Sequence, residues 1–126
     1  MSCVLDASAL LAFLQDEPGA VAVEQALSGS LLSSVNWSEV VQKSLVSGVD
    51  VCGMRQDVEA LGVAILPFTT EEAEHAADLW PKTRRLGLSL GDHACLALAL
   101  RTGSWVLTAD RAWENLQLDL AIQVIR

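Results

Sequence analysis

The chain has 126 residues, 52% of them hydrophobic, and its 16 acidic and 8 basic residues give a net charge of −8. This length predicts a single domain, residues 1–126, that buries a core without disulfides. No uncharged apolar run approaches the roughly 20 residues needed to cross a bilayer, which excludes a membrane-spanning segment. The N-terminus lacks a basic region and carries Asp6 where a signal peptide would be apolar, so we expect a cytoplasmic protein.

The cysteines and the charge narrow the class of protein. Cys3, Cys52 and Cys95 have neither an even count nor a C-x-x-C spacing, which favours reduced thiols over disulfides or a thiolate zinc site. An acidic chain is an unusual nucleic-acid binder because phosphate affinity normally comes from Lys and Arg. Clustered carboxylates that hold divalent cations would reverse the local field, and the charge also suits a basic protein partner. The charge alone decides between none of these.

The first half of the chain predicts strands that alternate with helices, from its apolar runs and its helix start and stop signals. In chain order we expect a strand at 2–5, helices at 7–14 and 18–27, a strand at 31–35, helices at 37–46 and 51–61, and a strand at 63–66. Pro18 suits the first turn of the second helix, and Asn36 is the expected N-cap of the third, with Glu39 at capping-box spacing. Asp50 is the expected cap of the fourth helix, which Gly62 closes.

The second half continues this alternation. In chain order we expect a long helix capped by Thr70 that Pro81 kinks or ends, a basic segment at 82–87, a helix at 92–101, a strand at 104–108, a helical turn at 111–115 and a final strand at 121–125. Ser89 and Asp92 have capping-box spacing at the start of the helix 92–101. Such alternation implies right-handed crossovers. The expected fold class is therefore α/β, with a central, mostly parallel sheet of about five short strands covered by helices on both faces.

Four acidic residues follow the strands or begin the helices of this arrangement. Asp6 and Asp110 come directly after strands, and Glu39 and Asp92 lie in the first turns of helices. Because ligands bind a parallel sheet outside the carboxyl ends of its strands, all four can point into one crevice. Each also has an ordinary alternative role, Asp6 as an N-cap, Asp110 in an Asx-turn, and Glu39 and Asp92 as capping-box acids. Only their convergence separates a site from a set of caps.

Four carboxylates at one edge favour a divalent metal site. Like charges held together repel one another and stay ionised only when cations neutralise them. Oxygen ligands without thiolates favour Mg²⁺ or Mn²⁺ over zinc. Two such ions would lower the pKa of a bound water, orient it toward a phosphorus atom and stabilise the leaving oxygen. The acids therefore predict phosphoester cleavage with one or two ions per site.

The same residues carry a resemblance that runs nearly from end to end. Segments 4–11, 36–40, 90–97 and 107–111, in that order, resemble a PIN domain and, more narrowly, the VapC type of toxin ribonuclease. The last two segments, with the strand between them, are the most specific part. The resemblance implies a PIN fold and cleavage of RNA that depends on Mg²⁺ or Mn²⁺. It also implies a homodimer, the toxin of a toxin–antitoxin pair, whose site a cognate antitoxin blocks.

The resemblance also implies roles for individual residues. The acidic quartet that binds the metal and is catalytic is matched in position by Asp6, Glu39, Asp92 and Asp110. Ser8 and Thr108 match the usual hydroxyl positions of the family, where Ser8 can orient a metal-bound water. Glu114 lies one helical turn past Asp110 and is a spare acid that can assist or replace it.

Basic and aromatic residues are the expected RNA contacts, each with a structural alternative. The best candidates for phosphate contacts are Lys82, Arg84, Arg85 and Arg111. A solvated basic loop is an equal alternative for the first three. The four tryptophans can stack on bases, but anchoring of the core and of a dimer interface is the favoured prediction for them. His93 points about 100° around the helix from Asp92 and is expected to be a surface or packing residue.

Two other classes of function are open alternatives. A response-regulator-like receiver also gathers acids around Mg²⁺, but it needs a phosphoacceptor Asp after the third strand and a late Lys. Here the third strand is followed by Pro67, and no Lys lies beyond Lys82. A non-catalytic PIN-like binding module is one alternative. A metal-dependent phosphoesterase with another substrate is the other, although the small size argues against a structure-specific DNA nuclease.

Overall fold

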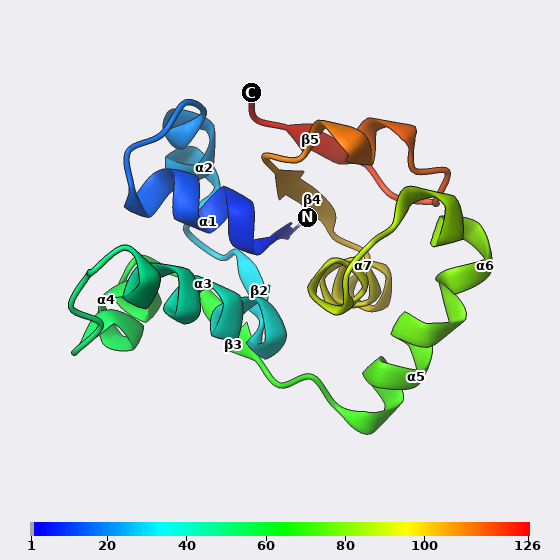
Figure 1. Cartoon of the computed structure of the whole chain (residues 1–126), viewed down its shortest axis with the longest axis horizontal. Helices are drawn as coiled ribbons and strands as arrows, with labels where there is room; N and C mark the ends of the chain where they lie inside the picture. The colour runs from blue at the N-terminus through cyan, green and yellow to red at the C-terminus, as the bar shows by residue number, and fades with distance from the viewer. Residues whose placement is uncertain (1) are drawn as a thin grey trace.

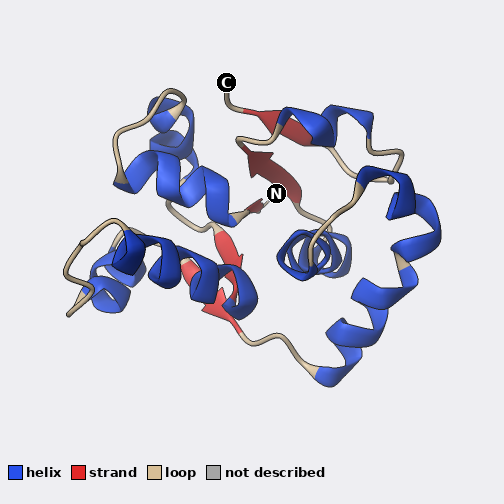
Figure 2. Cartoon of the chain, in the orientation of Figure 1, coloured by secondary structure: helices blue, strands red, loops and turns tan. Residues whose placement is uncertain are grey.

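In the computed structural model, which describes residues 2–126, five parallel strands form one sheet between two layers of helices (Figures 1 and 2). The strand order is β3-β2-β1-β4-β5, and each neighbouring pair is parallel. The strands are β1 (Cys3–Leu5), β2 (Leu31–Ser33), β3 (Ala64–Leu66), β4 (Trp105–Thr108) and β5 (Ile122–Val124). The predicted α/β class with a parallel sheet is confirmed.

The helices divide between the two faces of this sheet (Figure 1). One face is covered by α1 (Ala7–Leu14), α2 (Ala20–Ala26), α3 (Ser34–Val46) and α4 (Met54–Ala60). The other side carries α5 (Thr70–Asp78), α6 (Trp80–Thr83), the 3-10 helix η1 (Arg84–Leu86) and α7 (Leu90–Thr102), and a second 3-10 helix, η2 (Arg111–Asn115), follows β4. Over residues 2–126, no helix is both long enough and apolar enough to cross a membrane.

Alternate side chains of the strands supply two apolar cores. Cys3, Leu5 and Leu107 pack with the layer of α1 to α4, whereas Val4 and Val106 pack against α7. All five are buried, as the period of two along a strand requires when both faces of a sheet are covered. This double burial explains why the strand sequences are continuously apolar.

Several predicted boundaries in the first half are wrong. The second strand ends at Ser33 instead of residue 35, because the Ser33 hydroxyl accepts a backbone N–H and caps α3. Asn36, the predicted cap, lies inside the first turn of α3. The helix predicted at 18–27 begins only at Ala20 and the one at 51–61 only at Met54, each after a glycine in the left-handed region. Asp50 accepts an N–H in a turn before α4 and does not cap it.

The predicted break at Pro81 is confirmed. The helix that precedes it is capped by Thr69, one residue before the predicted cap, since the Thr69 hydroxyl accepts the N–H of Glu72 at 3.2 Å. That helix ends at Asp78, and Pro81 lies in the first turn of α6, where its missing N–H costs nothing. The remaining strands and helices agree with the predicted ranges to within two residues.

Candidate metal centre

Asp6, directly after the central strand β1, is buried, with 5% of its surface exposed. Its Oδ1 accepts the Ser8 hydroxyl at 2.7 Å and the Ala9 N–H at 2.8 Å, which makes it the predicted N-cap of α1. Its Oδ2 accepts the Thr108 hydroxyl at 2.6 Å. Burial raises the pKa of Asp6 to about 6; the three hydrogen bonds oppose this rise, and the Asp92 charge adds to it. A cation beside this carboxylate would offset its burial.

The hydroxyls of Ser8 and Thr108 join the start of α1 to the end of β4. Ser8 Oγ accepts the Ala109 N–H at 2.9 Å, and Thr108 Oγ1 accepts the Asp110 N–H at 3.0 Å. Because each hydroxyl also donates to Asp6, both residues fix the position of that carboxylate. The strand residue Thr108 thus links the first acid of the predicted quartet to the backbone of the last.

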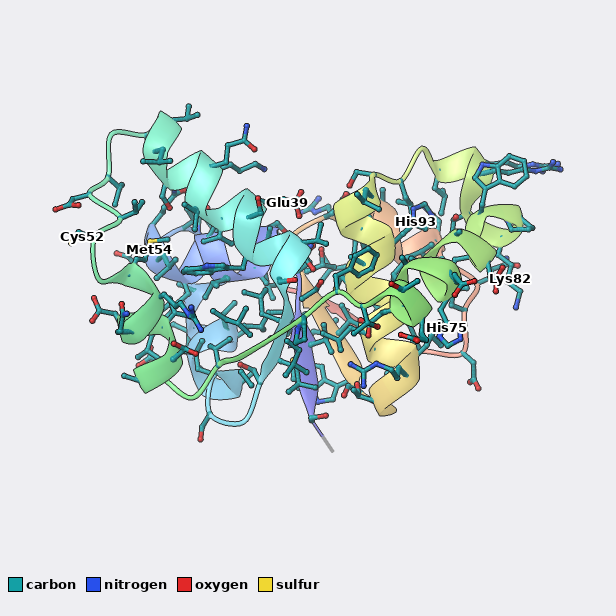
Figure 3. All side chains as sticks on the ribbon, turned by 90° about the horizontal axis from the view of Figure 1, so that it is seen from below. Glu39, Cys52, Met54, His75, Lys82 and His93 are labelled. Carbon is teal, nitrogen blue, oxygen red and sulfur yellow. The ribbon has the colours of Figure 1, made fainter. Side chains whose placement is uncertain are left out.

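Glu39 lies in α3 and faces the first turn of α7 (Figure 3). Its carboxylate occupies the space that a side chain at Gly91 would fill, since a methyl group built there would overlap its oxygens. The buried side chain of Asn36 donates from Nδ2 to Glu39 Oε1 at 2.9 Å and to the Gly91 carbonyl at 3.0 Å. Glu39 is therefore held against a helix that follows it by some fifty residues. The alternative role as a capping-box acid of α3 is wrong.

Asp92 lies beside Glu39 at the start of α7. Its Oδ2 accepts the Ser89 N–H at 2.9 Å and its own N–H donates to Ser89 Oγ at 3.2 Å, so the predicted capping box is confirmed. Burial raises the pKa of the Cys95 thiol, and the charges of Asp6, Asp92 and Glu39 raise it further. The three acids come from separate parts of the chain, the end of β1, α3 and α7.

Asp110 and Glu114 are both exposed. Asp110 Oδ1 accepts the Ala112 N–H at 2.9 Å and caps η2, which is the Asx-turn role of the alternative prediction. Glu114 lies in the same 3-10 helix. The structure therefore places Glu39 against the residue before Asp92, and Asp92 near enough to Asp6 for its charge to raise the pKa of Asp6, whereas Asp110 and Glu114 are exposed.

The chemistry of this cluster suits a hard divalent cation. Throughout residues 2–126, no group of three or more His, Cys, Asp or Glu side chains is close enough, as arranged, to hold an ion. The donors at the edge are nevertheless all carboxylate oxygens, and Gly91 leaves the room that the Glu39 carboxylate occupies. The buried Asn36 Oδ1 has no hydrogen-bond partner in the described part of the chain, and a water could donate to it. The residues fit Mg²⁺ or Mn²⁺, and the four-acid ligand set stays a prediction.

The predicted phosphate contacts lie apart from the acids. Lys82, in α6, is on the far side of α7 from Glu39 (Figure 3), and Arg84 and Arg85 follow it in η1. All three side chains are exposed. Arg111, at the start of η2, donates from Nε to the carbonyl of the C-terminal residue at 3.0 Å.

His93 has a more specific role than the predicted surface or packing residue. Its Nδ1 donates to the Ser89 carbonyl at 3.0 Å, and its Nε2 lies 2.8 Å from Thr83 Oγ1. Thr83 is buried at the end of α6. These bonds tie the segment before α7 to the first turn of that helix.

Asn36 and Gly91 are the residues that the sequence prediction missed. Asn36 precedes Glu39 by three positions, which places both on one face of a helix, and this spacing was the available signal. Gly91 stands in the first turn of an otherwise apolar helix, where a glycine lowers helix propensity. A glycine directly before a candidate metal ligand is the signal that marks a close approach.

Parallel strands, two helical layers and acids at the carboxyl edge define an α/β protein with a candidate metal-dependent site. Residues 3–117 match the family model described as the PIN domain. The chain belongs to the PIN domain family. No curated protein matches the sequence.

Several solved structures share this fold over the whole chain. A toxin–antitoxin complex from Klebsiella pneumoniae matches with a TM-score of 0.77 and 17% identity over 99% of this chain and 98% of that one. VapBC-1 from nontypeable Haemophilus influenzae matches with a TM-score of 0.71 and 19% identity over 98% of each chain. VapBC2 from Rickettsia felis, bound to a DNA fragment from its promoter, matches with a TM-score of 0.69 and 14% identity over 100% of each. These similarities confirm the predicted PIN-like fold.

Proposed function

We propose that this chain is an endoribonuclease dependent on Mg²⁺ or Mn²⁺, and the toxin of a VapBC-type toxin–antitoxin pair. The observation that carries the proposal is the position of Glu39, whose carboxylate lies over Gly91 next to Asp92. Glu39 caps none of the described helices, and Asn36, which donates to it, also donates to the Gly91 carbonyl. Asp6, Glu39 and Asp92 are near enough to the buried Cys95 thiol for each charge to raise its pKa. Membership of a family whose members are generally nucleases supports the chemistry.

The residues divide the work of such a site. The proposed ligands of one or two ions are Asp6, Glu39, Asp92 and Asp110. When bound, the ions supply a water of lowered pKa and neutralise charge on the leaving oxygen. The chain itself fixes the ligands, since Ser8 and Thr108 hold Asp6 and Asn36 holds Glu39. Such supporting bonds preserve the geometry on which the chemistry depends.

The direct test is cleavage of total cellular RNA by the purified protein with Mn²⁺ or Mg²⁺, with EDTA, and by the Asp92→Asn variant. We expect discrete fragments that vanish with EDTA and with the substitution. Asp57→Asn is the matched control, because Asp57 is an exposed acid in the first turn of α4, and it should cleave normally. Cleavage by Asp92→Asn at the wild-type rate would contradict the proposal.

A substrate comparison separates this function from its alternatives. Single-stranded RNA, a DNA flap and a phosphomonoester are offered under identical conditions. Cleavage of RNA alone supports the ribonuclease, whereas cleavage of either other substrate instead of RNA indicates a different phosphoesterase. Metal binding by thermal shift without cleavage of any substrate indicates a binding module.

The proposed partners are an antitoxin protein and a second copy of the chain, in the cytoplasm. The similar structures are described as toxin–antitoxin and VapBC complexes, and a net charge of −8 suits a basic antitoxin segment. The buried Cys3 and Cys95 are free thiols, as a reducing compartment favours. We expect the product of a small basic reading frame next to the gene to copurify with the chain and stop cleavage. A monomer mass by light scattering would contradict the homodimer.

A further inference from the structure

The segment between α5 and α7 is a basic stretch in an acidic chain. Residues 79–91 contain Lys82, Arg84 and Arg85 but no Asp or Glu, in a chain of net charge −8. Across residues 2–126, none of the ion pairs uses these three cations. All three side chains are exposed, so their charge is available to an anionic partner.

Trp80 opens the same segment and is 57% exposed. Of the other tryptophans, Trp113 is buried and Trp37 and Trp105 pack against the core, as predicted for core anchors. Trp80 is not a core anchor, and its predicted alternative role at a dimer interface stays a prediction. The Arg84 guanidinium lies over the Trp80 ring, 5.7 Å from its centroid, in a cation–π arrangement. More than half of the Trp80 surface still faces solvent with Arg84 in place. An exposed indole beside cations that no ion pair of the described chain uses offers a stacking surface together with positive charge.

The segment is fastened to the helix that carries Asp92. Thr83, between Lys82 and Arg84, is 1% exposed, and its hydroxyl lies 3.0 Å from the Leu79 carbonyl and 2.8 Å from His93 Nε2. His93 follows Asp92 directly in α7. The exposed side chains therefore belong to a segment that is bonded to His93, one residue from the proposed metal ligand Asp92.

We propose that Trp80, Lys82, Arg84 and Arg85 form a platform, across α7 from Glu39 (Figure 3), that docks an unpaired RNA strand. A base stacks on the exposed surface of Trp80, and the three cations contact phosphates. Aromatic faces combined with cations bind single strands because each unpaired base presents a π-face and each nucleotide a phosphate. A duplex hides its base faces, so the Trp80 platform selects unpaired RNA. The choice of RNA as ligand rests on the proposed nuclease function.

Binding is measured apart from cleavage, by fluorescence anisotropy of a labelled single-stranded RNA with the Asp92→Asn protein in EDTA. In this background Trp80→Ala should weaken binding by about tenfold or more, and Trp80→Phe, which keeps a π-face, should retain most of it. Replacing Lys82, Arg84 and Arg85 together by Gln should lower the slope of log K against log salt by about 2, at about 0.7 for each phosphate contact. The exposed cations of α3 and α4, changed by Lys43→Gln and Arg55→Gln, serve as the control and should leave affinity nearly unchanged.

The results separate this inference from the function on which it rests. Unchanged affinity and salt slope in the Trp80→Ala and triple variants would overturn the platform, as would equal affinity for a hairpin duplex. Loss of dimer mass in Trp80→Ala with unchanged RNA binding would assign the surface to self-association and also overturn it. Platform variants that bind normally while the wild type cuts RNA refute the platform alone. A wild type that binds through the platform but never cuts refutes only the nuclease.

Discussion

The acidic edge of the sheet has a buried half and an exposed half, and the two halves are built differently. In the buried half, the buried Asp6 is held by hydroxyls from two elements, and the half-buried Glu39 is held in α3 against the first turn of α7. In the exposed half, Asp110 accepts an N–H two residues further along its own turn. A cap is satisfied locally, whereas a site depends on contacts between distant segments. The buried half therefore carries the stronger structural evidence for a metal centre.

The two halves also differ in their electrostatic cost. Burial and the charge of Asp92 raise the pKa of Asp6 to about 6, so its ionised form destabilises the ion-free fold. Asp110 is exposed and carries no comparable burial. Sites that bind ions commonly reduce stability in this way, because the ligands are arranged for the ion and not for the empty fold. Substitutions in the two halves should accordingly differ in both activity and stability.

The largest expected effect belongs to Asp6→Asn. Removal of a ligand should lower RNA cleavage by more than about a hundredfold, since even residues that only support ligands contribute about 10- to 100-fold. The free energy of unfolding in EDTA should stay unchanged or rise, because the amide is neutral and has no ionised form to bury. Urea denaturation beside a cleavage assay measures both quantities. Asp110→Asn is the control, and we expect it to give no gain in the free energy of unfolding. An Asp6→Asn protein that cleaves RNA normally and is less stable than the wild type would contradict the prediction.

The pH dependence of the free energy of unfolding should also reflect the burial of Asp6. The pKa of Asp6 is raised from the usual 3.8 to about 6, so the native state binds an extra proton between these values. The contribution of Asp6 to the free energy of unfolding should therefore fall as pH rises from about 4 to 6, by about 3 kcal/mol in all. It is complete below pH 4 and lost above pH 6.

The variant isolates this contribution from those of other groups. The difference in unfolding free energy between the wild type and Asp6→Asn, followed by urea denaturation in EDTA, should change across that pH range. Mn²⁺ at neutral pH should reduce this difference in unfolding free energy, because a bound cation would offset the burial of the Asp6 charge. A difference that stays constant with pH would show that Asp6 titrates normally.

Local signals explain what the sequence predicted correctly. The five strands, the capping box of Ser89 and Asp92 and the break at Pro81 depend on neighbouring residues, and all are confirmed, although the second strand is two residues shorter than predicted. The positions of the acids after strands and at helix starts follow from the same local patterns. Whether the acids converge depends on the strand order β3-β2-β1-β4-β5. The alternation of strands and helices predicts that the strands are parallel, but it does not predict their order.

Long-range contacts explain what the sequence did not predict. Ser33 and Asn36 are both residue types that favour the N-cap position. Ser33 caps α3, because the Asn36 amide donates instead to Glu39 and to the Gly91 carbonyl. The residues of the last contact are 55 positions apart, so no local pattern contains it. The contact between His93 and Thr83 was not predicted either, because it joins two different helices, α6 and α7. Through this contact His93, which was expected to be a surface or packing residue, connects the two helices.

Gly91→Ala tests the convergence itself and should have an intermediate effect. The added methyl group would displace the flexible Glu39 side chain, so cleavage should fall by about tenfold or more. Helix propensity favours alanine by about 1 kcal/mol, so the thermal midpoint should hold or rise. Leu90→Ala, at an exposed position of the same turn, is the control and should leave cleavage near normal. Full activity in Gly91→Ala would mean that the contact with Glu39 has no part in the chemistry.

The smallest effects are expected in the exposed half, where Asp110 and Glu114 compete for the role of fourth acid. The Asp110 N–H is bonded to Thr108, which donates to Asp6, so Asp110 is coupled to the buried half through one residue. Glu114 has no such bond among the described residues and lies further along η2. Because Asp110 is exposed, water can replace it as a ligand, so we expect Asp110→Asn to lower cleavage by only about tenfold. Glu114→Gln should lower cleavage by less than about twofold, both measured at saturating Mn²⁺. The reverse order would move the fourth ligand to Glu114 and would leave Asp110 as the cap of η2.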